Sequence, residues 1–148
     1  MSDVTFPCEQ DGVLQLLPHR DPFVWVTRIK ECQPGEHILA ELDVDPDLPL
    51  FKGHFPGQPI FPGVIVMEAL AQAACCCIMA EPGRETSIGY LAGIDGAKFR
   101  EMTLPGDTIQ LEATIVSSNK RFCKAEVRAT KDGKVVAEAT QKYIMAKE

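Results

Sequence analysis

The sequence predicts one α+β domain over residues 1–148, in which an antiparallel sheet of about six strands wraps around a single long helix. The first observation is that residues 63–80 are apolar on almost every side of a helix, so this helix must be covered nearly all round. The second is that most of the remaining apolar segments are short, rich in β-branched and aromatic residues, and separated by turn residues. A sheet that curves around the helix satisfies both observations.

The elements before the long helix are short. Their expected bounds are a helix over residues 9–18, a turn over 19–22, and strands over 23–32 and 37–44. Residues 45–62 contain five prolines, which exclude a helix interior and a central strand. Because the same segment carries several large apolar residues, we expect a proline-stiffened loop that packs on the core.

After the long helix, which Gly83 ends, the chain predicts strands only. Their expected bounds are residues 87–99, 107–117, 122–130 and 134–145. The Asp132-Gly133 pair is typical of the tight turn of a hairpin between the last two strands. Residues 108–116 and 122–127 alternate apolar with polar side chains, as half-exposed antiparallel strands do.

Composition and charge exclude several classes of function. The formal net charge of −6 argues against nucleic acid as a partner, because a phosphate backbone requires a basic surface. The six cysteines show neither metal-ligand spacing nor a disulfide framework, so we expect reduced, mostly buried thiols and no bound metal. Residues 62–80 have the length of a membrane span but contain Glu68 and Gln72, which favours a buried helix. The N-terminus lacks the pattern of a signal peptide, as expected for a cytoplasmic protein.

Glu68 stands inside the apolar helix, where an unpaired carboxylate is costly. Among its neighbours three and four positions away, only Gln72 can form a hydrogen bond with it. Glu68 is therefore either a structural group bonded to Gln72 and water or a proton donor in a site. The residue pattern alone leaves both interpretations open.

His54 lies in the proline-rich loop, fourteen residues before Glu68. Gly53 and Gly57 flank it, so the backbone there can approach a ligand closely. A single loop histidine is more often structural than catalytic. Its place just before the N-terminus of the long helix favours the catalytic interpretation.

The N-terminus of the long helix can bind an anionic oxygen. Pro62 precedes Gly63, and the first amides of a helix point outward at the positive end of its dipole. Gly63 has no side chain to block a carbonyl oxygen that becomes an oxyanion there. Acid, base and oxyanion site together suit proton abstraction next to a carbonyl, and apolar side chains such as Phe55, Phe61 and Val64 suggest an aliphatic substrate.

Several motifs resemble those of the FabZ-type 3-hydroxyacyl-(acyl-carrier-protein) dehydratases, in the family's order and over most of the chain. The matching segments are Leu16-Leu-Pro-His-Arg20, Asp21-Pro-Phe23, Gly53-His-Phe-Pro-Gly57, Pro62-Gly-Val64, Met67-Glu-Ala-Leu-Ala-Gln-Ala-Ala74, Lys98-Phe-Arg100 and Pro105-Gly-Asp107. The spacing between His54 and Glu68 fits as well.

The resemblance implies a hot-dog fold and dehydration of a (3R)-3-hydroxyacyl chain, held on the phosphopantetheine of acyl carrier protein, to the trans-2-enoyl product in fatty acid biosynthesis. It implies a homodimer with shared active sites, and often a trimer of dimers. His54 of one subunit would remove the C2 proton and Glu68 of the other would protonate the departing hydroxyl. Gly63 would hold the thioester carbonyl, and Gln72 would support the site, without a cofactor. The isomerising FabA type carries aspartate at the acid position, so we expect no isomerisation.

The chain departs from the family pattern at four places: tyrosine is usual at Asp21, aspartate at Thr27, methionine at Phe61, and small residues across Cys75-Cys-Cys77. The changes at Asp21 and Thr27 concern the packing of the turn over residues 18–23. Phe61 is expected to lie beside the acyl channel and to narrow it. These departures concern chain-length preference rather than the reaction.

Carrier proteins are acidic, so docking requires a basic surface. The candidates are Lys98, Arg100, Lys120, Arg121 and Lys124. An ordinary solvated strand face explains the same residues equally well.

Three other functions remain open for this fold. A hot-dog thioesterase would use a carboxylate to activate water, and a binding subunit would carry out no chemistry. The His54 loop placed before Glu68 argues against both of these. A dehydratase specialised for polyketide or unusual-lipid synthesis would have the same residues.

Overall fold

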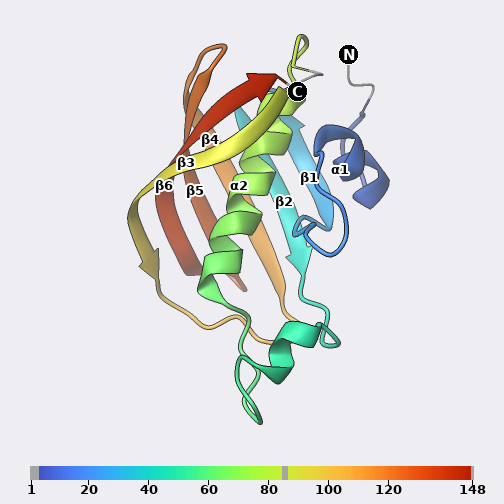
Figure 1. Cartoon of the computed structure of the whole chain (residues 1–148), viewed down its shortest axis with the longest axis vertical. Helices are drawn as coiled ribbons and strands as arrows, with labels where there is room; N and C mark the ends of the chain where they lie inside the picture. The colour runs from blue at the N-terminus through green and yellow to red at the C-terminus, as the bar shows by residue number, and fades with distance from the viewer. Residues whose placement is uncertain (1–3, 85–86, 148) are drawn as a thin grey trace.

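A long helix lies against one face of a six-stranded antiparallel sheet in the computed structural model, which describes residues 4–84 and 87–147 (Figure 1). In chain order the elements are α1 (Gln10–Leu16), β1 (Arg28–Gln33), β2 (His37–Asp43), the 3₁₀ helix η1 (Pro49–Lys52), α2 (Gly63–Met79), β3 (Ser87–Phe99), β4 (Thr108–Ser118), β5 (Phe122–Lys131) and β6 (Lys134–Lys147). The predicted α+β arrangement of strands around one long helix is therefore confirmed.

The strand order is β1-β2-β4-β5-β6-β3, and every neighbouring pair is antiparallel. β1 and β3 therefore form the two edges of the sheet. Cys8 makes an isolated bridge to Ile29 along the β1 edge. β3 carries the other edge, and it crosses in front of the sheet beside α2 (Figure 1).

The core lies between α2 and the inner face of the sheet. Alternate residues of the central strands point at the helix and are fully buried, such as Ile109, Leu111 and Ala113 of β4. Close packing also explains Gly89, because a Cβ atom there would lie 2.7 Å from Sγ of Cys75. The expectation of mostly buried thiols is confirmed for Cys75, Cys76, Cys77 and Cys123, whereas Cys8 and Cys32 are partly exposed.

One expectation about the first third of the chain was wrong. The strand expected over residues 23–32 begins only at Arg28. Before it the chain runs across α2, where Oε1 of Gln72 accepts a hydrogen bond from the Trp25 amide at 2.8 Å, so a helix side chain takes the bond that a neighbouring strand would make. The proline-rich loop is not entirely irregular, because η1 forms with Pro49 at its first position, where a missing N–H costs nothing.

α2 ends one residue before the expected bound, and all its residues from Val66 to Met79 are buried except Glu68. Among the helices of residues 4–84 and 87–147, none is both long and apolar enough to cross a bilayer.

Candidate active site

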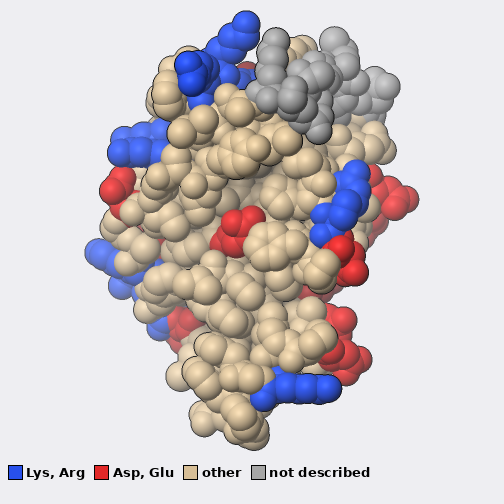
Figure 2. Space-filling view, viewed as in Figure 1, with Lys and Arg blue, Asp and Glu red and all other residues tan. Residues whose placement is uncertain are grey.

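Glu68 is the sixth residue of α2, on the side of the helix that the sheet leaves partly open. Its side chain is 24% exposed. Figure 2 views the molecule from the α2 side and shows an acidic group inside a broad uncharged area. A partly exposed carboxylate in apolar surroundings can exchange a proton with a ligand that covers this face.

Gln72 fixes Glu68 from one helical turn further along α2. Its Nε2 atom donates to Oε2 of Glu68 at 3.0 Å and to the carbonyl oxygen of Phe23 at 3.0 Å. Because Oε1 of Gln72 also accepts from the Trp25 amide, this buried amide joins the helix to the segment before β1. Gln72, the one neighbour along the helix that could bond Glu68, does so, and this contact fits both the structural and the proton-donor interpretation of Glu68.

His19 also faces Glu68, which sequence reasoning missed. Its Nε2 atom lies 3.8 Å from Oε2 of Glu68, and its side chain is 23% exposed. The two residues are 49 positions apart, so no helix or strand spacing relates them. The only signal in the sequence was the place of His19 within the Leu16 to Arg20 motif.

His54 is held in a loop that closes on itself. Its amide donates to the Leu50 carbonyl at 3.1 Å, and its own carbonyl accepts from the Ile60 amide at 2.9 Å. The imidazole Nδ1 lies 2.7 Å from the carbonyl oxygen of Ile60, and the ring stacks on Phe55 at 4.0 Å. Since a carbonyl oxygen only accepts, Nδ1 carries a hydrogen, and in the neutral ring Nε2 keeps its lone pair.

The N-terminus of α2 presents the amides of Gly63 and Val64. The hydrogen bonds of the helix begin two residues later, where the amides of Ile65 and Val66 both donate to the Pro62 carbonyl. A side chain at position 63 would crowd the Phe99 ring, because a Cβ atom there would lie 2.8 Å from it. Gly63 therefore allows close packing of β3 as well as access to the helix amides.

The apolar residues expected around the substrate divide into two groups. Val64 is 74% exposed and Phe55 is 48% exposed, so both are available to a ligand. Phe61, in contrast, is buried, and its ring packs edge-on against Trp25 at 5.6 Å and against Phe51 at 6.4 Å. In the single chain Phe61 belongs to an aromatic cluster of the core, and its place beside an acyl channel stays a prediction.

His54 and Glu68 do not meet within one chain. Among the described residues, the recorded polar contacts of His54 lie inside its own loop, and those of Glu68 are to Gln72 and His19. A site that uses both His54 and Glu68 directly must therefore bring the two residues together in some other way.

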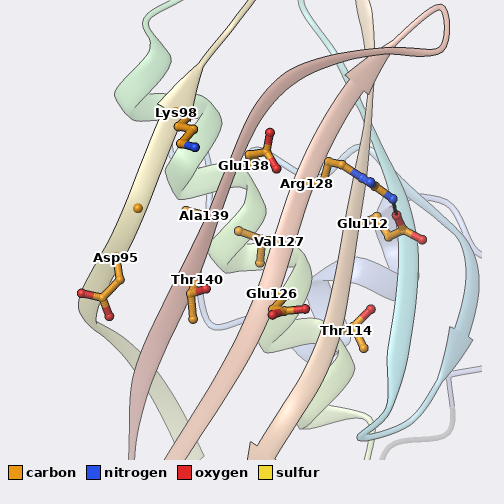
Figure 3. Close-up of a pocket in the computed structure, with 11 residues that line it drawn as sticks. Asp95, Lys98, Glu112, Thr114, Glu126, Val127, Arg128, Glu138, Ala139 and Thr140 are labelled. Atoms are coloured by element: carbon orange, nitrogen blue, oxygen red, sulfur yellow. Dashed lines mark hydrogen bonds and ion pairs between the residues drawn. The ribbon is translucent and has the colours of Figure 1, made fainter.

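The five basic residues expected to contact the carrier protein lie in two different places. Lys98, Arg100 and Lys124 lie on the outer face of the sheet, opposite α2, and Arg100 is already paired with Glu138 at 2.7 Å. Lys98 lines a hollow of about 400 Å³ there together with side chains of both charges (Figure 3). Lys120 and Arg121 instead lie at the turn between β4 and β5, at the end of the molecule.

Comparison with known proteins identifies the family. The model of the FabA-like domain matches residues 17–140, which include His19, His54, Glu68 and Gln72. The chain belongs to the FabA-like family. Similar members include the 3-hydroxyacyl-(acyl-carrier-protein) dehydratase FabZ of Ruminiclostridium cellulolyticum, 43% identical over 91% of this chain and 95% of that protein. FabZ of Polynucleobacter asymbioticus is 46% identical over 86% of this chain and 85% of that protein.

Solved structures show the fold of this FabA-like domain. The dehydratase heterocomplex ApeI:P of Xenorhabdus doucetiae superposes with a TM-score of 0.77 at 17% identity, over 98% of this chain and 94% of the other. A hypothetical thioesterase from Streptococcus pneumoniae, solved with coenzyme A, gives 0.62 at 12% identity, over 81% and 85% of the two chains. The expected hot-dog fold is confirmed, and its use by both proteins shows that the fold alone does not decide between their reactions.

Proposed function

We propose that this protein dehydrates (3R)-3-hydroxyacyl-(acyl-carrier-protein) to the trans-2-enoyl thioester in fatty acid biosynthesis, as a hydro-lyase of the FabZ type. Curated FabZ relatives are 37% to 46% identical to it over most of their length. The observation that carries the catalytic proposal is the contact of His54 Nδ1 with the Ile60 carbonyl, because it leaves a basic Nε2 atom in a fixed loop.

In the proposed reaction Nε2 of His54 removes a proton from C2 of the substrate. The electrons of the C–H bond move toward the thioester carbonyl, whose oxygen is bound by the helix amides at Gly63 and Val64. When the C3–O bond breaks, Glu68 gives its proton to the departing hydroxyl, which leaves as water. The C2–C3 double bond forms, with His54 now protonated and Glu68 ionised.

The proposal places the site between two subunits. β3 is an edge strand with several large apolar side chains exposed, and unpaired edge strands of this kind favour association. They are Tyr90, Leu91, Ile94 and Phe99. Pairing of β3 across a two-fold axis would cover these side chains and would make two equivalent sites, each with His54 from one chain and Glu68 from the other.

The remaining parts of the proposal concern partners and location. The carrier protein would dock on a basic surface, and Lys120 and Arg121, at the turn between β4 and β5, are the two candidates that do not lie on the outer face of the sheet. Association of three dimers and a cytoplasmic location complete the proposal. Because Glu68 rather than aspartate is the acid, the product is expected to remain the 2-enoyl isomer.

Hydration of trans-2-enoyl thioesters by the pure protein tests the function. We expect reversible addition of water to crotonyl and longer enoyl thioesters, with no release of free thiol and no 3-enoyl isomer on chromatography. Thiol release without hydration would instead indicate a thioesterase. Binding without either reaction would indicate a non-catalytic subunit.

A further inference from the structure

His19 is placed against Glu68 by contacts on both sides of its turn. Nη1 of Arg20 donates to the carbonyl oxygens of Leu17 and His19, at 2.8 and 2.6 Å, and so closes the turn. On the other side of the turn, Nε2 of Gln72 donates to the carbonyl oxygen of Phe23, four residues after His19. The same Nε2 atom also donates to Glu68. The same buried amide therefore sets the position of the turn and the orientation of the carboxylate.

The surroundings of His19 decide which ring nitrogen carries the hydrogen. Nδ1 is buried and has no hydrogen-bond partner among the described residues. A buried N–H without an acceptor is costly, so the neutral ring carries its hydrogen on Nε2, the atom that faces Glu68. Burial lowers the pKa of His19, although the neighbouring Glu68 carboxylate opposes this shift, and the ring is therefore neutral at neutral pH.

We propose that His19 is a positioning residue, whose Nε2–H orients the Glu68 carboxyl and stabilises the carboxylate formed when Glu68 gives up its proton. This inference rests on the proposed function of Glu68. The separation of 3.8 Å exceeds a hydrogen bond, and such contacts in active sites commonly shorten when substrate binds.

The other titratable groups near Glu68 do not perform this role. Cys75, one turn beyond Gln72 on α2, has its pKa raised to about 12, chiefly by burial. Burial also raises the pKa of Tyr143 on β6 well above its usual range. Both groups stay protonated throughout a neutral assay. The guanidinium of Arg20 is directed to backbone carbonyls, so His19 is the group beside Glu68 that can respond to its charge.

Two amide substitutions test whether a donor at the position of Nε2 is needed, because both are polar but only one reaches that position. In His19→Gln the side-chain amide extends to about the place of Nε2, whereas in His19→Asn it reaches only to about the place of Nδ1. We expect His19→Gln to keep kcat for enoyl-thioester hydration within about threefold of the unmodified protein. His19→Asn should lose about tenfold or more in kcat, with KM changed by less than about threefold.

The pH profile provides a measurement that a purely structural role would not move. Hydration requires ionised Glu68 to accept a proton from water, so kcat rises with pH through the ionisation of Glu68. Without the Nε2–H donor the carboxylate is less stable and loses its proton only at higher pH. The acidic limb should move to higher pH in His19→Asn and stay in place in His19→Gln.

Equal behaviour of the two variants, or an unmoved limb in His19→Asn, would overturn the inference. If His19→Asn does not fold by circular dichroism, ¹⁵N NMR of the unmodified protein decides: neutral His19 with hydrogen on Nε2 at pH 7 supports the inference, and hydrogen on Nδ1 or a charged ring overturns it. If the unmodified protein has no hydration activity, the proposed function fails. A ¹³C NMR titration of Glu68 with and without the Asn change then still tests the effect of His19.

Discussion

The two faces of the sheet treat carboxylates in opposite ways. On the outer face several carboxylates are paired with a cation that stays charged, as Asp43 is with Arg28, Glu138 with Arg100 and Asp95 with Lys142. On the α2 face Glu68 has only the neutral amide of Gln72 and the imidazole of His19 beside it. A guanidinium never gives up its proton and holds its partner ionised, so it suits a structural carboxylate and not a proton donor. The choice of partner therefore separates structure from chemistry in this chain.

The size of a surface hollow, in contrast to the choice of partner, does not show where the chemistry takes place. The outer face carries the hollow of about 400 Å³ lined by strands β3 to β6, and Figure 3 shows charged side chains of both signs around it. Glu112 and Arg128, on the neighbouring strands β4 and β5, pair at 3.1 Å in its lining. The groups suited to proton transfer lie instead on a loop and a helix of the other face, where a second chain can complete the site.

The largest expected effect comes from removing the proton-transfer groups. His54→Ala and Glu68→Gln should each lower kcat by about 100-fold or more, because a general acid or base typically contributes roughly 10²–10⁴-fold. Folding should survive, as judged by circular dichroism. Glu138→Gln makes the same chemical change on the outer face and should leave kcat unchanged. Near-normal turnover in either site variant would show that its role is wrong.

Mixing the two inactive variants tests whether the α2 face works as half of a shared site. After random exchange about half the dimers are mixed, and each mixed dimer has one site with both His54 and Glu68 intact, so roughly a quarter of all sites should regain activity. Mass spectrometry of intact dimers must first show that exchange occurred. Exchanged dimers without activity would contradict the shared site.

Phe61 tests the packing of the loop before α2 against the aromatic residues of the core. Because its ring is buried against Trp25 and Phe51, Phe61→Ala should lower the free energy of unfolding by about 3 kcal/mol in urea titrations. Phe55→Ala, at a half-exposed ring, should cost less than about 1 kcal/mol. If Phe61 narrows the acyl channel, its loss should also shift activity toward longer enoyl chains. An unchanged chain-length profile would show that it does not line the channel.

The smallest effect is expected on the outer face. The guanidinium of Arg28 holds the pKa of Asp43 below its ordinary value of 3.8, with help from the Thr108 hydroxyl. A carboxyl with a lowered pKa stabilises the folded chain above its ordinary pKa, and this stability is lost as the pH falls through the lowered value. Since Asp43 is well exposed, Asp43→Asn should cost at most about 1 kcal/mol at pH 7, with kcat unchanged.

Urea titrations at several pH values check this last prediction. The difference between Asp43→Asn and the unmodified protein should shrink as the pH falls below 3.8. A difference that persists at low pH would mean that the substitution acts through packing rather than through charge.

Local patterns in the sequence were enough to predict most of the fold. The expected bounds of β3 are correct, and those of α2 are correct within one residue, because helix and strand periodicity and turn residues act over a few positions. The hydrogen bond from Gln72 to Glu68 also follows from spacing along one helix. His54 and Glu68 were found through their chemistry and their motifs.

Only the tertiary structure decided what depends on contacts between distant segments. It placed Phe23 and Trp25 against α2 rather than in a strand, because Gln72 bonds the Phe23 carbonyl and the Trp25 amide. It placed Lys98 on the opposite face of the sheet from Glu68, since register and alternation set the direction of each strand side chain. It also brought His19 to Glu68 across 49 residues, a contact that chain closure and packing create and that no local spacing encodes.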